Sequence, residues 1–249
     1  MLKLDNITKK YGTFEAVKHV SFNILPGEIV GFLGPNGAGK TTTIKMCCGL
    51  LMPDSGTITI GDENIATSPE RAKKLLGYVP DDPFLYDKLT GRQFVHFVGE
   101  IYGVPPMLRE QRVQHYLEQL DMIEKADDLI GSYSRGMKRK IALMAGIIHA
   151  PKVLLLDEPT LGLDAISAKR SKDIIRKLAK EEGTAVLITT HVMEIAEQIC
   201  DRIAVISKGS IIAQGTLEQL QAQAQNKGTL EDVFMTLTGE QPVETEGMV

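Results

Sequence analysis

The feature that most constrains this chain is a glycine-rich segment between two stretches of different character. Residues 34–41 read Gly-Pro-Asn-Gly-Ala-Gly-Lys-Thr, which matches the spacing G-x-x-x-x-G-K-[ST]. The run before it, Ile29–Leu33, is apolar without a polar alternate, as in a strand buried on both faces. The stretch from Lys40 to about Gly49 has the pattern of a helix. This order predicts a phosphate-binding loop, because glycines let successive backbone N–H groups point at phosphate oxygens.

Within this loop, Lys40 is expected to reach the β- and γ-phosphates of a nucleotide, where it would also assist catalysis. The hydroxyl of Thr41 is expected to coordinate Mg²⁺. A glycine-rich turn that fits the pattern by chance is the alternative, and the strand before and helix after the loop argue against it. The residues expected to bind nucleotide here are Gly34, Pro35, Asn36, Gly37, Ala38, Gly39, Lys40, Thr41 and Thr42.

A second apolar strand ends in two carboxylates. Asp157 and Glu158 follow residues 153–156, and Asp157 is expected to hold Mg²⁺ through water beside the phosphate-binding loop. Glu158 is expected to act as a general base or to position the attacking water. A solvated acidic turn is the alternative, and the phosphate-binding loop favours the catalytic interpretation. His191 follows the strand at 185–190, at the sheet edge where ligands collect, and either binds the γ-phosphate or is structural.

Overall composition excludes several classes of protein. Lys plus Arg is 28 and Asp plus Glu is 32, so the net charge of −4 lacks the basic excess of a nucleic-acid scaffold. Cys47, Cys48 and Cys200 are an odd number, which fits reduced thiols better than a disulfide framework. No apolar run approaches ~18 residues, and the first residues lack an apolar secretion segment. We therefore expect a protein that is neither membrane-spanning nor secreted.

Strands and helices alternate along most of the chain. Apolar, unpatterned strands between helices predict a mostly parallel sheet covered on both faces, hence an α/β fold. Residues 2–24 alternate as strands, whereas residues 91–129 have helical spacing and form a helical insert. Residues 216–239 predict two short helices before a polar tail.

In chain order, these features resemble the ATP-binding subunit of an ABC transporter, over nearly the whole sequence. The family's ordered motifs are an aromatic residue, the P-loop, a Gln loop, a signature motif, an acidic strand, a D-loop and a switch histidine. Their counterparts here are Tyr11, residues 34–42, the segment at Asp81, residues 133–137 (Tyr-Ser-Arg-Gly-Met), Val153–Glu158, Leu161–Asp164 and His191.

The resemblance implies a P-loop NTPase (RecA-like) core with a mostly parallel sheet. It adds an N-terminal antiparallel β subdomain and an inserted α-helical subdomain at about 91–135. Residues 1–220 would form the ATP-binding cassette, and residues 221–249 a short C-terminal helix and polar tail.

The resemblance also assigns site roles outside the P-loop. Tyr11 would stack on adenine. Ser134 and Gly136 would contact the γ-phosphate of ATP held by a second subunit, a homodimer partner or a paralogue, so that two ATP are sandwiched. Asp81 stands where the family has Gln and would lie near Mg²⁺, with Asp82 as an alternative occupant. The cations that follow the signature motif, residues 138–140, are expected to form a solvated helix face.

Three features that depart from the usual family pattern indicate which subfamily of ABC transporters the chain resembles. Residues 134–137 (Ser-Arg-Gly-Met), an acidic residue after Val79-Pro80 and the tail 230–239 resemble the bacterial ABC-2 type exporters. This implies an ATPase that uses ATP and Mg²⁺, contacts no nucleic acid and drives a separate membrane permease through residues 81–102. It would be cytoplasmic, held on the inner face of the cell membrane by that permease.

Three alternative functions account for fewer of these sequence features. A soluble ABC-type ATPase without a membrane partner usually carries tandem cassettes, a long coiled coil or zinc modules, which are not evident here. A P-loop kinase or GTPase does not explain the signature segment, and no N-K-x-D motif is present. A binding module without hydrolysis conflicts with the intact Lys40, Asp157, Glu158 and His191.

Overall fold

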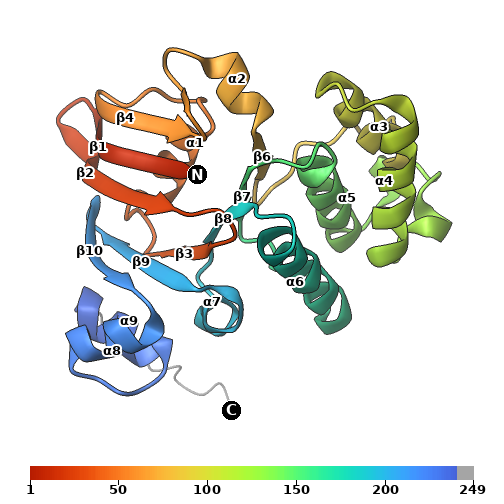
Figure 1. The fold of residues 1–249 in the computed structure, drawn as a ribbon. Helices are drawn as coiled ribbons and strands as arrows, with labels where there is room; N and C mark the ends of the chain where they lie inside the picture. The colour runs from red at the N-terminus through yellow and green to blue at the C-terminus, as the bar shows by residue number, and fades with distance from the viewer. Residues whose placement is uncertain (240–249) are drawn as a thin grey trace.

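Two sheets form the frame of the computed structural model, which describes residues 1–239 (Figure 1). The first sheet is antiparallel with the strand order β2-β1-β4-β5. The second has the order β10-β9-β3-β8-β7-β6, and all its strands run parallel except β10. The strands are β1 (Leu2–Tyr11), β2 (Phe14–Ile24), β3 (Ile29–Leu33), β4 (Ser55–Ile60), β5 (Glu63–Asn64), β6 (Leu76–Val79), β7 (Val153–Asp157), β8 (Ala185–Thr189), β9 (Arg202–Ser207) and β10 (Ser210–Gly215).

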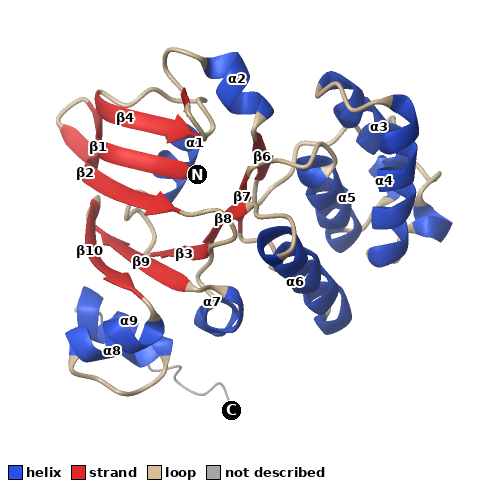
Figure 2. Cartoon of the chain, in the orientation of Figure 1, coloured by secondary structure: helices blue, strands red, loops and turns tan. Residues whose placement is uncertain are grey.

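Helices separate into groups around these sheets (Figure 2), with α3, α4 and α5 together at one end of the molecule. The helices are α1 (Lys40–Cys47), α2 (Pro69–Lys74), α3 (Gly91–Ile101), α4 (Pro106–Gln119), α5 (Arg135–Ile147), α6 (Ala165–Lys180), α7 (Met193–Ile199), α8 (Leu217–Ala224) and α9 (Leu230–Thr238), with 3-10 turns at Ile123–Lys125 and Ile130–Ser132. Among residues 1–239, no helix has both the length and the apolar character needed to cross a membrane. The expected α/β fold, with an antiparallel N-terminal sheet, a mostly parallel second sheet and helical segments, is confirmed.

The parallel sheet divides two apolar cores. Along β7, Val153 and Leu155 pack with the antiparallel sheet and α1, whereas Leu154 and Leu156 pack with α5 and α6. Successive side chains of a strand point to opposite faces, so a strand between two cores has to be apolar at every position. This is the physical reason for the unpatterned runs in the sequence.

A third apolar core lies at the C-terminal end of the described chain. Helices α8 and α9 pack there against β9, β10 and α7, and the backbone N–H of Leu230 donates to the Glu197 carboxylate at 2.9 Å. Both helices begin at a threonine with a capping box, Thr216 and Thr229. The two short helices expected at 216–239 are therefore present. The expected boundary at residue 220 falls within α8, and the division into cassette and C-terminal segment stays a prediction. The polar tail at 240–249 lies outside the described residues.

Candidate functional site

An open cavity of about 440 Å³ lies at the carboxyl ends of the parallel strands. It brings together side chains that are far apart in the sequence, because parallel strands end at a common edge. Most residues expected to bind nucleotide or act in catalysis line it. The lining residues are Tyr11, Phe14, Ala16, Asn36, Gly37, Gly39, Lys40, Thr41, Thr42, Asp81, Asp157, Glu158, Leu161 and His191.

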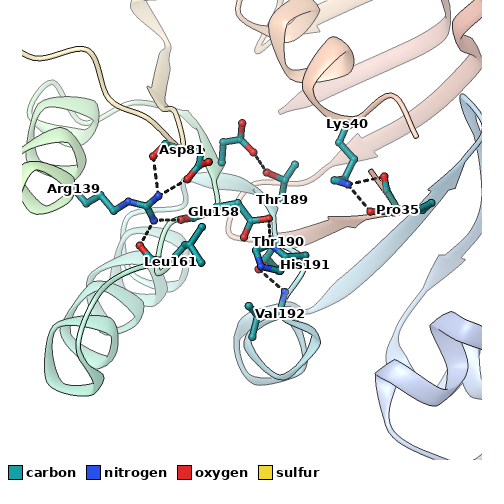
Figure 3. Close-up of polar contacts among 12 residues, drawn as sticks. Pro35, Lys40, Asp81, Arg139, Glu158, Leu161, Thr189, Thr190, His191 and Val192 are labelled. Atoms are coloured by element: carbon teal, nitrogen blue, oxygen red, sulfur yellow. Dashed lines mark hydrogen bonds and ion pairs between the residues drawn. The ribbon is translucent and has the colours of Figure 1, made fainter. Parts of the chain in front are cut away.

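The glycine-rich loop between β3 and α1 is curled tightly. Gly39 has φ +108°, and a Cβ at this position would lie 2.5 Å from the backbone oxygen of Ala16. Only glycine fits this close approach without strain. The Nζ of Lys40 folds over the loop and donates to the backbone oxygens of Pro35, at 3.0 Å, and Gly34 (Figure 3). Gly34 and Ala38 are buried. Lys40 and Thr41, the first residues of α1, line the cavity, so the N-terminal end of this helix, with its free backbone N–H groups, lies at the cavity.

Asp157 ends β7 directly opposite Thr189 of β8. The Thr189 hydroxyl donates to the Asp157 carboxylate, which holds that side chain at the edge of the cavity. Thr41, the first helical threonine of α1, lines the same cavity. A hydroxyl and a carboxylate are hard oxygen donors, the ligand type that Mg²⁺ prefers when phosphate oxygens supply the rest. These two side chains therefore fit a bound Mg²⁺–nucleotide.

Glu158 and His191 form an ion-pair geometry, with Nδ1 of His191 2.8 Å from the Glu158 carboxylate (Figure 3). The Glu158 side chain is 13% exposed and the His191 side chain 60% exposed, so the histidine covers the carboxylate from the solvent side. Glu158 has φ +51°, an uncommon conformation for a non-glycine residue, and its N–H donates to Thr189 at 2.9 Å. Such a conformation persists only where its surroundings enforce it, and it is frequent at active sites.

Asp81 lines the cavity, and its carboxylate, which the family resemblance predicts to lie near Mg²⁺, accepts a hydrogen bond from Arg139. A second arginine, Arg135, lies 3.9 Å from the same carboxylate. Asp82 is exposed and lies outside the cavity lining. The role of Asp81 toward Mg²⁺ stays a prediction.

The expectation of a solvated face for residues 138–140 is wrong for Arg139. Its side chain is 5% exposed and points into the protein. The pattern of three consecutive cations concealed this, because consecutive helical residues face different directions. Lys138 does lie at the surface, where it pairs with Asp87 at 3.0 Å.

Ser134 and Gly136 lie outside the cavity, on the signature segment that begins α5. The Ser134 hydroxyl accepts a hydrogen bond from the N–H of Met137 at 3.3 Å and so caps the helix. A Cβ at Gly136 would lie 3.6 Å from the backbone oxygen of Gly162, so the segment faces the turn after β7. One chain therefore does not bring these two residues onto its own phosphate-binding loop.

Sequence reasoning missed several contributors to this region. Phe14, 62% exposed, lines the cavity near Tyr11, and the closeness of the two aromatics in the sequence was the available signal. Leu161 was recognised only as part of a motif, yet it lines the cavity. Thr189 became identifiable only from the register of β7 and β8, which the sequence does not contain.

A phosphate-binding loop at the edge of a parallel sheet, with Asp157, Glu158 and His191 beside it, defines the class of P-loop nucleotide hydrolases. The family follows from comparison with known proteins. A sequence model described as ABC transporter matches residues 17–161. The linearmycin resistance ATP-binding protein LnrL of Bacillus subtilis (strain 168) is 42% identical over 220 residues, which cover 88% of this chain and 70% of that protein.

Solved structures agree with this assignment. The structure of an ATP-binding subunit of an ABC transporter has a TM-score of 0.91 at 28% identity, covering 95% of this chain and 99% of that one. A dimeric structure of MJ0796, a bacterial ABC transporter cassette, has a TM-score of 0.79 at 27% identity, covering 87% and 99%. This chain belongs to the ABC transporter family, as an ATP-binding subunit and an ATPase.

Proposed function

We propose that this chain binds ATP with Mg²⁺, pairs with a second ATP-binding subunit around two ATP, and powers a separate membrane permease for export. The proposal rests on the observation that the expected ATP-contacting residues lie in two separate places on one chain. Lys40, Asp157 and Glu158 share one cavity, whereas Ser134 lies outside it, exposed, at the N-terminus of α5. A second copy could supply its signature segment to this cavity, and the dimeric solved cassette supports that arrangement.

Within one half-site, each residue has a distinct role. Lys40 and the N–H groups of residues 34–39 would bind the β- and γ-phosphates, and Tyr11 would stack on adenine with Phe14 nearby. Thr41 and Asp157 would hold Mg²⁺, with Asp81 as a further candidate; when bound, the ion neutralises charge on the phosphates.

Glu158 would accept a proton from the attacking water, because its carboxylate lines the cavity beside the phosphate-binding loop. His191 would orient that carboxylate and the water. The Nδ1–H tautomer of neutral imidazole donates to Glu158 and leaves Nε2 as an acceptor. Ser134 and Gly136 of the second subunit would complete the γ-phosphate contacts.

An apolar groove of about 330 Å³ supports docking of a permease through residues 81–102. Phe84 is 93% exposed at this groove, beside Phe94 and Tyr102. Such exposed apolar side chains mark interaction surfaces. The name of LnrL refers to linearmycin resistance, which supports export as the direction of transport. Docking on a permease would hold the chain peripherally on the inner face of the cell membrane.

The variant Glu158→Gln tests this function, with Glu231→Gln as a control on the exposed face of α9. Without a general base, turnover is expected to fall by at least about 100-fold while ATP still binds. The variant should then accumulate as an ATP-bound dimer, which light scattering during gel filtration measures. Wild-type turnover in the variant, or a monomer in saturating ATP, would contradict the proposal.

A further inference from the structure

The guanidinium of Arg139 lies buried where three segments meet: α5, the segment after β6 and the turn after β7 (Figure 3). Removing a charge from water is costly unless it is paired and hydrogen-bonded, so a 5% exposed arginine requires specific partners. None of the roles proposed above uses this side chain, although it touches two segments of the candidate site.

Three of the four acceptors of Arg139 are backbone oxygens. Nη1 donates to Glu158 at 3.0 Å and to Leu161, and Nη2 donates to the backbone oxygen of Asp81 at 2.9 Å. The fourth acceptor is the Asp81 carboxylate. Nε has no hydrogen-bond partner among residues 1–239. The planar fork of arginine suits this task, because lysine presents a point charge without fixed donor directions.

These contacts fix the backbone of Glu158 from both sides. Its N–H donates to Thr189 at 2.9 Å, and its carbonyl accepts from Arg139 at 3.0 Å. Between these bonds the residue holds φ +51°, and its carboxylate meets His191. Loss of the arginine would free the carbonyl and relax the conformation that directs the carboxylate into the cavity.

We propose that Arg139 is a positioning residue for ATP hydrolysis. By donating to the backbone carbonyls of Glu158 and Leu161, it fixes the turn after β7 that contains both residues. Its ion pair with Asp81 links this turn to the segment after β6. This inference rests on the proposed role of Glu158. Asp81 lines the cavity and also pairs with Arg139. A change in the position of Asp81 would therefore move Arg139 and, through it, Glu158.

The first test measures steady-state ATP hydrolysis by the full chain with Mg²⁺ for Arg139→Gln. The matched control is Lys140→Gln, the same change one residue along the helix. Losing the buried contacts is expected to lower kcat at least about 10-fold. The KM for ATP is expected to stay within about threefold of wild type, since the phosphate-binding loop is unchanged. A kcat equal to that of the control overturns the inference.

The second test is a double-mutant cycle with Asp81→Asn. If the two side chains act as a unit, the double variant loses much less than the product of the two single losses. Independent, multiplicative losses overturn the proposed link between Asp81 and the Glu158 turn.

The third test does not depend on turnover and so separates this inference from the proposed function. Amide hydrogen exchange is measured over residues 158–164 in Arg139→Gln and Lys140→Gln, with the melting temperature of each variant. Faster exchange confined to this turn supports positioning. Exchange that equals the control, or that rises throughout the chain with a lower melting temperature, overturns it. Absence of hydrolysis in the wild type would contradict the proposed function, and the exchange result would still decide the role of Arg139.

Discussion

The nucleotide cavity and the helical segment α3–α5 differ in how much of a site each contains. The cavity gathers a glycine loop, three carboxylates, a histidine and two aromatics within one chain. The helical segment carries its signature residues Ser134 and Gly136 at the start of α5, outside the cavity, and an apolar groove around Phe84 near its other end. The cavity is therefore a nearly complete half-site, whereas the helical segment has surfaces that need partners.

Substitutions in the two regions should therefore have different consequences. Changes at the phosphate-binding loop or at the aromatics of the cavity should alter ATP binding by a single subunit. Changes at the signature segment should spare that binding and remove a step that needs two subunits. Substitutions at Lys40, Ser134 and Tyr11 test this contrast, and a substitution at His149 tests the stability of the helical segment. Their expected effects decrease in the order Lys40, Ser134, His149 and Tyr11.

Lys40→Ala should have the largest effect. Losing the charge-assisted contacts to the phosphates is expected to weaken ATP binding at least about 100-fold. Binding of a fluorescent ATP analogue to the isolated subunit measures this, with Lys45→Ala on the exposed side of α1 as the control. Unchanged affinity in Lys40→Ala would remove the basis for the phosphate-binding role of the loop.

Ser134→Arg should remove hydrolysis while the single subunit still binds ATP. The larger side chain would block approach of a second subunit's nucleotide, and turnover is expected to fall at least about 100-fold. The lost helix cap costs only about 1 kcal/mol, which Ser134→Ala measures separately in unfolding experiments. Loss of ATP binding by the Ser134→Arg monomer would instead place the residue in its own chain's site.

His149, just after α5, should make the helical segment sensitive to acid. Burial lowers the pKa of its imidazole from 6.5 to about 4, although a hydrogen bond to the Leu76 oxygen at 3.1 Å opposes this. The ring also stacks on Tyr102, with centroids 3.8 Å apart. Below pH 6.5 the imidazole of His149 binds a proton in the unfolded chain but stays neutral in the folded chain. The folded state therefore loses stability as the pH falls from about 6.5 to about 4.

Between pH 7 and pH 5 this single group is expected to cost about 2 kcal/mol of unfolding free energy. His149→Phe keeps an aromatic ring for stacking but cannot bind a proton, and it should reduce the pH dependence by that amount, as measured by urea unfolding at both pH values. His115→Phe, at an exposed position, serves as the control. Equal pH dependence of the unfolding free energy in wild type and His149→Phe would show that His149 is not the group responsible.

Tyr11→Ala should have the smallest effect on the cavity. Removing one stacking ring is expected to weaken ATP binding by about 3- to 10-fold, and Tyr11→Phe should bind like wild type. The same titration applied to Phe14→Ala compares the two aromatics directly. A larger loss in Phe14→Ala would transfer the adenine-stacking role to the residue that the sequence motif does not mark.

Sequence patterns predicted the parts of this structure that depend on local chemistry. The phosphate-binding loop was identifiable because its glycines and Lys40 are close in the sequence, and the apolar run of β7 predicted burial on both faces. The partners of Asp157 and Arg139 were not identifiable. The first depends on the register between β7 and β8, and the second on packing of α5 against two loops. Both are set by contacts between distant segments, which residue spacing does not record.

The pairing of β7 with β8 also has a consequence for when activity appears during folding. Asp157 faces Thr189, and Glu158 is anchored to the same strand, across more than 30 residues of sequence. A register slip of one residue would reverse which side chains face each core, so these contacts exist only when the two strands are paired in this register. ATP hydrolysis can begin only after the central strands have closed in register. Recovery of turnover during refolding should therefore lag behind helix formation, and a nascent chain should consume no ATP.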